Sequence, residues 1–437
     1  MKVALIDLKE SRMGCNNKEV AGGFGNAMRG EGFASRIFEW FKRNKLKVPV
    51  MHLGYLSAIF RKHGHQVNYY ESNPGNEELV IMPSSLVGYD EETAFVREIK
   101  KKHPGRKVGF FGAFANTNPE IFLEGGADFI IKGEPEEAAG RIASGDIAPS
   151  GIIESVMLTD LESLPNPDWR GFPVYRYSYY PSLKKAPTLA VLTSRGCSFD
   201  CHYCPYMVVQ TPKFRSRSAG HIVDEIEKLQ RDFKVRSLVF RDIIFSINKK
   251  RAHEIADEII KRKIKIEWAC ETRTDCTDAE LLDHLYAAGL RAIHFGIESP
   301  VEEVLLKSGR KPIKESHQEA VIRHAQKLGI HVLGFFILGF VEDTRATMQR
   351  TIDYAKYLNP SLAQFDLMTP YPGTKFWDQI EPRITTKDWK KYTTYEPVVK
   401  LDHLTNEDLL EFKQKAYREF YFRPSWFLTH GKKVIFG

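Results

Sequence analysis

The first part of the chain alternates short apolar runs with stretches that are apolar at helical spacing. Residues 2–8 and 107–114 are apolar runs that predict buried strands, and residues 51–65 predict an amphipathic helix that ends at a glycine. Further strands and helices follow the same alternation with short connections. This pattern predicts an α/β fold, with a Rossmann-like domain built on a parallel sheet over residues 1–150. A long glycine-rich insert precedes Met51, and long loops in compact domains are usually functional.

A second alternating region follows a stretch rich in proline and aromatic residues, 151–186, which we interpret as a linker. Six strand–helix units are predicted over residues 187–375. The strands are expected at 188–194, 235–240, 265–270, 291–298, 331–339 and 362–368. A closed TIM barrel has eight such units, so six predict an open, partial TIM-like barrel with its active site at the carboxyl ends of the strands.

The remaining residues, 376–437, are expected to form a small helical region. A cap-like start at Thr405 precedes an apolar stripe at helical spacing. The stripe consists of Leu409, Phe412, Ala416 and Phe420. The aromatic residues after this helix, with Lys432 and Lys433, leave two alternatives open. The segment contacts a membrane surface, or it is a tail docked on the barrel, which is the more common arrangement.

The composition is that of an ordinary globular protein, with 43% hydrophobic and 27% charged residues. The net charge of +7 is spread over mixed-sign helix faces, so we expect no specific nucleic-acid partner. No apolar run reaches the roughly 20 residues of a spanning helix, and we expect a cytoplasmic protein with no transmembrane segment. Thiols stay reduced in the cytoplasm, so clustered cysteines among the six indicate metal ligands or redox groups.

Three of the cysteines, Cys197, Cys201 and Cys204, fall within eight residues, after the first predicted barrel strand. Such thiolates can bind zinc or an iron–sulfur cluster. A structural zinc site needs four ligands, and the chain has no second C-x-x-C, although His202 could serve as a fourth. The spacing fits better a [4Fe–4S] cluster that leaves one iron open. Tyr203 precedes the last cysteine, where an aromatic ring can pack on a cofactor.

The C-x3-C-x2-C spacing, the aromatic residue before the third cysteine and the six-unit barrel together resemble the radical S-adenosylmethionine (SAM) superfamily. The resemblance implies a [4Fe–4S] cluster whose open iron binds SAM. One-electron cleavage of SAM then gives a 5′-deoxyadenosyl radical that abstracts a substrate hydrogen. It also implies an electron donor such as flavodoxin or ferredoxin.

Further motifs extend this resemblance. "WACETRTD", "HFGIES" and "ILGFVEDT" resemble the third-, fourth- and fifth-strand motifs of the superfamily. The SAM contacts that the resemblance implies are Tyr203, Asp242, Arg273, Glu298, Ile337 and Gly339, with Glu342 near adenine. Asp242 and Ile243 stand where the family usually has two acidic residues, which weakens one polar contact.

The N-terminal region resembles the cobalamin-binding domain of cobalamin-dependent radical SAM enzymes, through "IMPSSLVGY", "GFFGAFANTNPEIFLEGGADFIIKGEPEE" and "LESLPNPDW". It lacks the D-x-H-x-x-G signature that supplies a histidine below cobalt. The implied cobalamin contacts are Ser84, Ser85, Gly112, Ala113, Gly133 and Glu134. Small residues at strand ends allow a planar ring to approach the backbone. The alternative is a degenerate domain that has lost the cofactor.

The function that these resemblances imply is transfer of a methyl group by bound cobalamin to an unactivated carbon, or phosphorus, of a small-molecule substrate. The alternatives are a non-methylating radical SAM cyclase, oxidase or rearrangement enzyme, and a zinc-stabilised binding protein. Aromatic strand ends hint at a lipid-like or natural-product substrate, although core packing explains most of them. Arg215 and Arg217 could meet SAM or substrate, or lie exposed. Asp224, Glu225 and Glu227 are expected on a solvated face.

Overall fold

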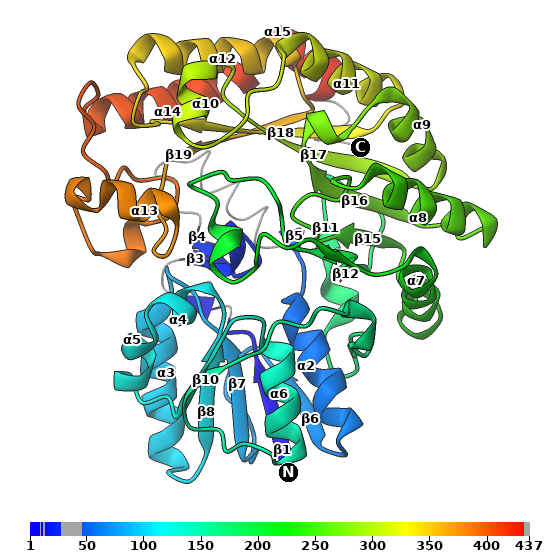
Figure 1. Cartoon of the computed structure of the whole chain (residues 1–437), viewed down its shortest axis with the longest axis vertical. Helices are drawn as coiled ribbons and strands as arrows, with labels where there is room; N and C mark the ends of the chain where they lie inside the picture. Colours follow the sequence, from blue (N-terminus) through cyan, green and yellow to red (C-terminus); the bar gives the residue numbers. More distant parts are fainter. Residues whose placement is uncertain (9, 12–13, 28–45, 432–437) are drawn as a thin grey trace.

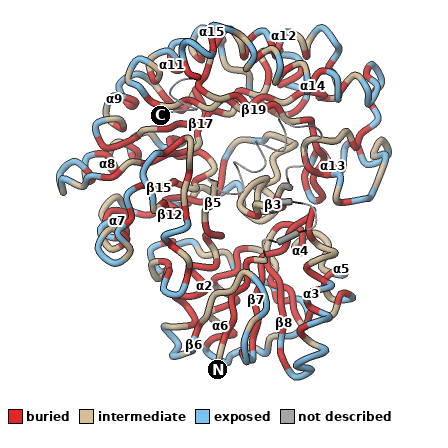
Figure 2. The backbone as a smooth tube through the Cα atoms, turned by 180° about the vertical axis from the view of Figure 1, so that it is seen from behind, coloured by how far each residue is buried: buried red, intermediate tan, exposed pale blue. Residues whose placement is uncertain are grey.

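Two six-stranded parallel sheets form the protein, whose computed structural model describes residues 1–8, 10–11, 14–27 and 46–431. The first sheet and its helices form the lower half of Figure 1, and the second sheet curves beneath an outer layer of helices in the upper half. Buried residues concentrate on the strands of both sheets, whereas the outer sides of the helices are exposed (Figure 2). The α/β class is therefore confirmed.

The first sheet has the strand order β10-β9-β8-β7-β1-β6. Its strands are β1 (Lys2–Ile6), β6 (Gln66–Tyr70), β7 (Leu79–Pro83), β8 (Lys107–Phe111), β9 (Phe129–Lys132) and β10 (Gly151–Glu154). All five residues of β7 are buried, as expected for a parallel strand covered on both faces. The order reverses beside β1, which pairs with both β6 and β7. Ligands of open α/β sheets bind outside the carboxyl ends of the strands at such a switch point.

Helices cover both faces of this sheet. On one face α2 (Met51–Lys62) packs against α6 (Pro135–Ser144), as Figure 1 also shows. Among the described residues this half also contains the α-helices α3 (Tyr89–Lys102), α4 (Ala113–Thr117) and α5 (Pro119–Glu124). Two of the helices, α4 and α6, begin directly after strands β8 and β9, so their first turns lie at the carboxyl edge of the sheet.

The stretch predicted as a linker contains two short strands. β10 pairs with β9 in parallel and becomes the edge of the first sheet. β11 (Ser178–Tyr179) pairs antiparallel with β5 (Leu46–Lys47). The apolar pattern could not reveal them, because β10 is mostly exposed and β11 has two residues.

The second sheet runs in chain order, β12-β15-β16-β17-β18-β19, with every pairing parallel. Its strands are β12 (Thr188–Val191), β15 (Ser237–Phe240), β16 (Glu267–Thr272), β17 (Leu290–Glu298), β18 (His331–Leu338) and β19 (Leu362–Leu367). Its long helices are α7 (Ala219–Phe233), α8 (Lys249–Lys261), α9 (Ala279–Ala287), α11 (Glu315–Lys327) and α12 (Arg345–Leu358). Within the described residues β19 does not pair back to β12, so the barrel is open as predicted.

One residue of α7 differs from its prediction. Glu225 is fully buried and pairs with Arg217 at 2.6 Å, so the expected solvated position is wrong for this residue. Arg217 is buried as well and donates to the carbonyl of Leu192 at 2.9 Å. A pair of opposite charges can occupy an interior position that neither could occupy alone, and an amphipathic pattern does not reveal such pairs.

The C-terminal helix α14 (Asn406–Tyr421) covers the open edge of the barrel. Thr405 forms the predicted cap, and all four residues of the apolar stripe are buried. The Tyr421 hydroxyl accepts from the backbone N–H of Ala363 at 3.0 Å and donates to its carbonyl at 2.9 Å. Tyr417 accepts from the N–H of Phe365. These bonds pair backbone N–H and C=O groups of the edge strand β19, which would otherwise be left without partners.

In the described part of the chain no helix is both long and apolar enough to cross a membrane. Lys432 and Lys433, on which the membrane-surface alternative depends, lie outside the described residues.

Candidate functional site

The three clustered cysteines lie on the loop that follows the first barrel strand, at the end of the barrel that faces the first sheet. Cys197 is buried, and Cys201 and Cys204 are half-buried. Burial raises the pKa of Cys197 and raises that of Cys204 to about 12, and repulsion from Cys201 acts in the same direction. Three thiolates in this loop therefore need a positive counter-charge, which a thiolate-binding metal centre supplies. The donor set fits such a centre.

Backbone geometry holds the start of this loop. Gly196 has φ +84°, and a Cβ there would lie 2.2 Å from the carbonyl oxygen of Lys213. Its N–H donates to Gln210 Oε1 at 2.9 Å, and the N–H of Cys197 donates to the carbonyl of Thr211 at 3.3 Å. Only glycine combines this conformation with so close an approach, so the loop closes on itself before the first cysteine.

The geometry does not favour the zinc alternative. Among the described residues no three Cys, His, Asp or Glu side chains converge on one ion position. A structural zinc site needs four ligands around a single ion, whereas an iron–sulfur cluster spreads its ligands over several irons. The possible fourth ligand, His202, uses its Nδ1 in a 3.1 Å hydrogen bond to Gln379 of α13 (Lys375–Ile380).

Arg310, which no sequence motif indicated, lies beside the second cysteine. Its Nη1 is 3.9 Å from Cys201 Sγ and 3.5 Å from Glu298 Oε1, and its Nη2 donates to the carbonyl of Gly296. The arginine side chain is 6% exposed, so little water screens its charge. A fixed positive charge therefore lies beside one of the three predicted cluster ligands.

Glu298 ends β17 in a strained conformation, with φ +67°. Burial raises the pKa of its carboxyl group, and the nearby Arg310 opposes this rise. Non-glycine residues in the left-handed region are uncommon and cluster at functional sites. The strain therefore supports a functional position for this predicted SAM contact.

Two other predicted SAM contacts are associated with the cysteine loop: one packs against the loop, and the other is part of it. Arg273 is buried, and its guanidinium carbon lies 4.0 Å from the centroid of the Phe199 ring. Phe199 stands between the first two cysteines of the loop. Arg273 also forms two 2.9 Å hydrogen bonds to Asp275. The ring of Tyr203 packs edge-on against Phe340, with 5.8 Å between the ring centroids. This contact links the loop to the carboxyl end of β18.

Ile337 and Gly339 lie at that end of β18. Ile337 is half-buried in an alternating strand whose other face is buried. Gly339 has φ +79°, and a Cβ there would lie 2.7 Å from a methyl carbon of Leu409 in α14. The C-terminal helix thus fixes the turn that carries this predicted contact.

Asp242 is placed differently from these residues. It is buried, and its carboxylate accepts from the N–H groups of Thr193 at 2.7 Å and Ser194 at 3.2 Å and from the Ser194 hydroxyl at 2.6 Å. Arg251 pairs with it at 3.2 Å. A direct contact with SAM would have to replace one of these bonds. As it stands, the carboxylate holds the turn that leads into the cysteine loop.

A cavity lies between the carboxyl edge of the first sheet and the cysteine loop. Five of the six predicted cobalamin contacts line it: Ser84, Gly112, Ala113, Gly133 and Glu134. The sixth, Ser85, is not in its wall, because its hydroxyl donates to Glu92 at 2.6 Å. The barrel side of the cavity is formed by Leu192, Arg195, Tyr206, Val209, Gln210 and Arg241.

Small residues shape the sheet side of this cavity. Gly112 follows β8 with φ +110°, and a Cβ there would lie 3.1 Å from Ser84 Oγ. Ala113 begins α4 with no exposed surface, and Gly133 follows β9 with φ +86°. Backbone is therefore the wall of the cavity at several strand ends, as a large planar ligand requires. The residues present fit such a ligand.

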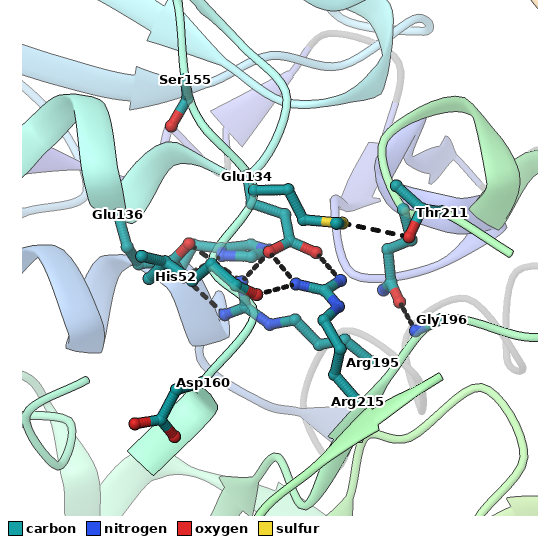
Figure 3. A network of polar contacts seen from close by, with 12 residues as sticks. His52, Glu134, Glu136, Ser155, Asp160, Arg195, Gly196, Thr211 and Arg215 are labelled. Atoms are coloured by element: carbon teal, nitrogen blue, oxygen red, sulfur yellow. Dashed lines mark hydrogen bonds and ion pairs between the residues drawn. The ribbon is translucent and has the colours of Figure 1, made fainter. Parts of the chain in front are cut away.

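A buried ion-pair network joins the two halves beside this cavity (Figure 3). Arg195, in β13 (Ser194–Arg195), binds Glu136 at 2.7 and 3.0 Å and Glu134 at 2.9 Å. Arg215, in β14 (Arg215–Ser216), binds Glu134 at 2.9 Å. Burial acts to raise the pKa of Glu136, but Arg195 and His52 outweigh it and hold the pKa well below its usual range. Arg215 is thus buried and paired, and not exposed.

The insert after β1 bridges the sheet and the loop. Lys18 is buried, donates to the carbonyl of Pro83 at 2.9 Å and pairs with Glu92 at 2.7 Å. Gly22 lies so close to the loop that a Cβ there would be 2.5 Å from the carbonyl carbon of Pro205, the residue after the last cysteine. Sequence reasoning marked this insert as functional from its length but could not place it.

The comparisons with known proteins agree with this geometry. Residues 191–355 match the model of the Radical SAM superfamily. An uncharacterised methyltransferase of Pyrococcus horikoshii is 33% identical over 270 residues, which cover 61% of this chain and 58% of that protein. The anaerobic magnesium-protoporphyrin IX monomethyl ester cyclase of Cereibacter sphaeroides is 31% identical over 276 residues, 62% of this chain and 44% of that protein. The chain thus spans about half the length of these curated relatives.

Solved structures share the two-part fold. The cobalamin-dependent S-adenosylmethionine radical enzyme OxsB, with aqua-cobalamin and S-adenosylmethionine bound, has a TM-score of 0.71 at 14% identity, over 98% of this chain and 72% of that chain. The radical S-adenosylmethionine methyltransferase TsrM of Kitasatospora setae, with cobalamin and a [4Fe–4S] cluster bound, has a TM-score of 0.65 at 16% identity, over 97% and 86%. At these identities the likeness shows the fold.

Proposed function

Because residues 191–355 match the Radical SAM superfamily, we propose that the chain is a cobalamin-dependent methyltransferase acting on an unactivated carbon, or phosphorus, of a small molecule. The observation that carries this proposal is the shared cavity, since the predicted cobalamin contacts and the loop residues after Cys204 line the same space. When bound, the cluster and SAM supply a 5′-deoxyadenosyl radical that abstracts a substrate hydrogen, and cobalamin supplies the methyl group.

In this proposal Cys197, Cys201 and Cys204 hold the cluster, and the chain's other residues position and shield it. Arg310 places a fixed positive charge beside Cys201. Arg273 supports the loop through Phe199. A buried polar site without bulk water strengthens each of these electrostatic contacts and limits side reactions of a radical.

We propose the SAM site at the carboxyl ends of the barrel strands, around the cysteine loop. Tyr203, Arg273, Glu298, Ile337 and Gly339 would form it, with Asp242 holding the Thr193–Ser194 turn. Ser84, Gly112, Ala113, Gly133 and Glu134 would face cobalamin across the cavity. An electron donor such as flavodoxin or ferredoxin and a partly apolar substrate remain parts of this proposal.

The first experiment tests the cluster. The protein is purified and reconstituted with iron and sulfide without oxygen, then measured for iron content and visible absorption. We expect iron–sulfur absorbance and cleavage of SAM to 5′-deoxyadenosine. Cys201→Ala should lose both, whereas the matched control Cys270→Ala, a buried cysteine in β16, should keep them. A colourless protein after reconstitution would contradict the proposal.

The second experiment tests methyl transfer. With cobalamin bound and candidate substrates added, a methyltransferase consumes two SAM molecules per turnover and releases S-adenosylhomocysteine together with 5′-deoxyadenosine. Non-methylating radical chemistry is the second candidate, because the Cereibacter sphaeroides relative is named as a cyclase. Formation of 5′-deoxyadenosine and product without S-adenosylhomocysteine would favour that candidate.

A further inference from the structure

One imidazole faces the proposed cobalamin cavity from the first turn of α2. His52 lines the cavity, and its side chain is 29% exposed. Its Nδ1 lies 2.8 Å from Glu136 Oε1 (Figure 3). Its Nε2 has no hydrogen-bond partner among the described residues. The ring therefore has one nitrogen held within the protein and the other available to a ligand.

The surroundings fix the tautomer of this ring in its neutral form. Glu136 has no exposed side-chain surface, and two hydrogen bonds from Arg195 keep its carboxylate charged. A carboxylate only accepts hydrogen bonds, so Nδ1 carries a hydrogen, and in the neutral ring Nε2 carries the lone pair. The edge of the ring packs against Phe111, with 5.9 Å between the ring centroids. The lone pair is thus oriented before any ligand arrives.

A histidine backed by a buried carboxylate is the arrangement that proteins use for metal-binding imidazoles. His52 has no companions for a site made of protein alone, because no three metal-binding side chains of the described chain meet at one ion position. A metal at this place must therefore bring most of its ligands with it, as a metal in a macrocycle does. The backbone wall at Gly112 and Gly133 leaves room for such a ring.

We infer that His52 binds the cobalt of cobalamin through Nε2, from the side of the first sheet, with Glu136 as its positioning residue. The inference rests on the proposed function, because it requires cobalamin in this cavity. It gives the chain an axial histidine although the sequence lacks D-x-H-x-x-G. Arg195 would couple this ligand to the cysteine loop, since it binds Glu136 and stands two residues before Cys197.

Electron paramagnetic resonance of the bound, reduced cofactor tests this directly. The unpaired electron of cob(II)alamin lies along the axial direction, so an axial ¹⁴N splits each cobalt line into a triplet and an axial ¹⁵N into a doublet. The full-length protein is prepared at natural abundance and with uniform ¹⁵N, and unlabelled cob(II)alamin is bound to each. We expect triplets in the first sample and doublets in the second.

Variants assign the nitrogen to one residue. His52→Gln should still bind cobalamin but lose the nitrogen splitting. The matched control is His65→Gln at the other end of α2, where the ring is bonded to the carbonyl of Ala143. This control should keep the splitting. The isotope comparison needs no variant, so it holds even where His52→Gln fails to fold.

The outcomes separate the two claims. Bound cobalamin without nitrogen splitting would overturn the role of His52 and leave the proposed function intact. Triplets that persist in the ¹⁵N-labelled protein would do the same, because the nitrogen would then come from the cofactor's own base. A protein that binds no cobalamin would overturn the cobalamin part of the proposed function and this inference with it.

Discussion

Arg195 and Glu136 connect the two halves of the protein by a buried two-point ion pair, with N–O distances of 2.7 and 3.0 Å. Arg195 stands two residues before Cys197, the first cysteine of the loop, and Glu136 holds His52 at the cavity. One pair of side chains therefore sets the position of the cysteine loop relative to the proposed cobalamin site. Each partner is 1% exposed or less, so the pair is not screened by water.

Replacing Arg195 by Met should destabilise the protein strongly. The change leaves Glu136 buried without its arginine and removes one of the two arginines of Glu134. Removing one partner of a buried pair costs about 3–5 kcal/mol, because the remaining charge is uncompensated. The free energy of unfolding from urea titration of the reconstituted protein measures this loss.

A control for this change is Lys102→Met, which breaks the exposed pair of Lys102 with Glu98 in α3. Surface changes of this kind alter stability by about 0.5 kcal/mol or less. Equal losses for the two variants would show that the interdomain pair contributes no more than a surface pair does.

Replacing Arg310 by Gln should lower the reduction potential of the proposed cluster. The arginine lies 3.9 Å from Cys201 Sγ, and its positive charge favours the reduced, more negative cluster. We expect a shift on the order of 50 mV, about tenfold in the equilibrium of a one-electron couple. A redox titration followed by electron paramagnetic resonance measures it.

Arg310→Lys is the matched variant, because it keeps a positive charge while losing the bond geometry of the guanidinium. Its potential should lie closer to that of the unchanged protein than the potential of Arg310→Gln does. Identical potentials in the two variants would refute an effect of charge.

Regular features of the structure follow from local sequence. The six barrel strands and the helices between them could be predicted because apolar spacing distinguishes strands from helices. The helix caps at Ser218, Asn248 and Thr344 are formed by residue types that favour caps. The cysteine loop could also be predicted from local sequence, since Cys197, Cys201 and Cys204 lie within eight residues.

The polar network between the halves could not be predicted. Arg195 and Glu136 are 59 residues apart, and each is a residue type that is normally exposed. Burial of such a residue depends on a partner that only the folded chain brings near, as with Glu225 and Arg217. The position proposed for His52 could not be predicted for the same reason, because it depends on a carboxylate 84 residues away.

The free energy of unfolding should decrease as the pH falls below neutral, because of the buried His294. This residue lies in β17, and burial lowers its pKa to about 4. In the unfolded chain the pKa is about 6.5, so between these values the unfolded state binds a proton that the folded state rejects. Stability is therefore lost as the pH falls through this window, by about 2 kcal/mol between pH 7 and pH 5.

Urea denaturation of the unchanged protein and of His294→Gln at both pH values measures this contribution. The variant should lose less stability between pH 7 and pH 5 than the unchanged protein does. His63→Gln, at an exposed position, serves as the control and should leave the pH dependence unaltered. If His294→Gln had the same pH dependence as the unchanged protein, the burial of this imidazole would not explain it.

Gly22→Ala should loosen the cysteine loop from the insert. Gly22 has φ +63°, and a Cβ would lie 2.5 Å from the carbonyl carbon of Pro205 and 2.6 Å from the backbone nitrogen of Tyr206. The left-handed conformation alone costs about 1–2 kcal/mol in alanine, and here the backbone contact adds to that cost. Since Pro205 follows Cys204, displacement of this segment should also lower the iron content after anaerobic reconstitution.

Gly64→Ala separates the two effects. Gly64 has φ +79°, and no atom lies within 4 Å of a Cβ built there, so this variant carries the conformational cost without the clash. It should lose about 1–2 kcal/mol of unfolding free energy and retain its full iron content. Because both variants make the same chemical change at a left-handed glycine, any excess loss of iron in Gly22→Ala belongs to the contact between insert and loop. Equal iron contents would mean that the insert does not support the cluster site.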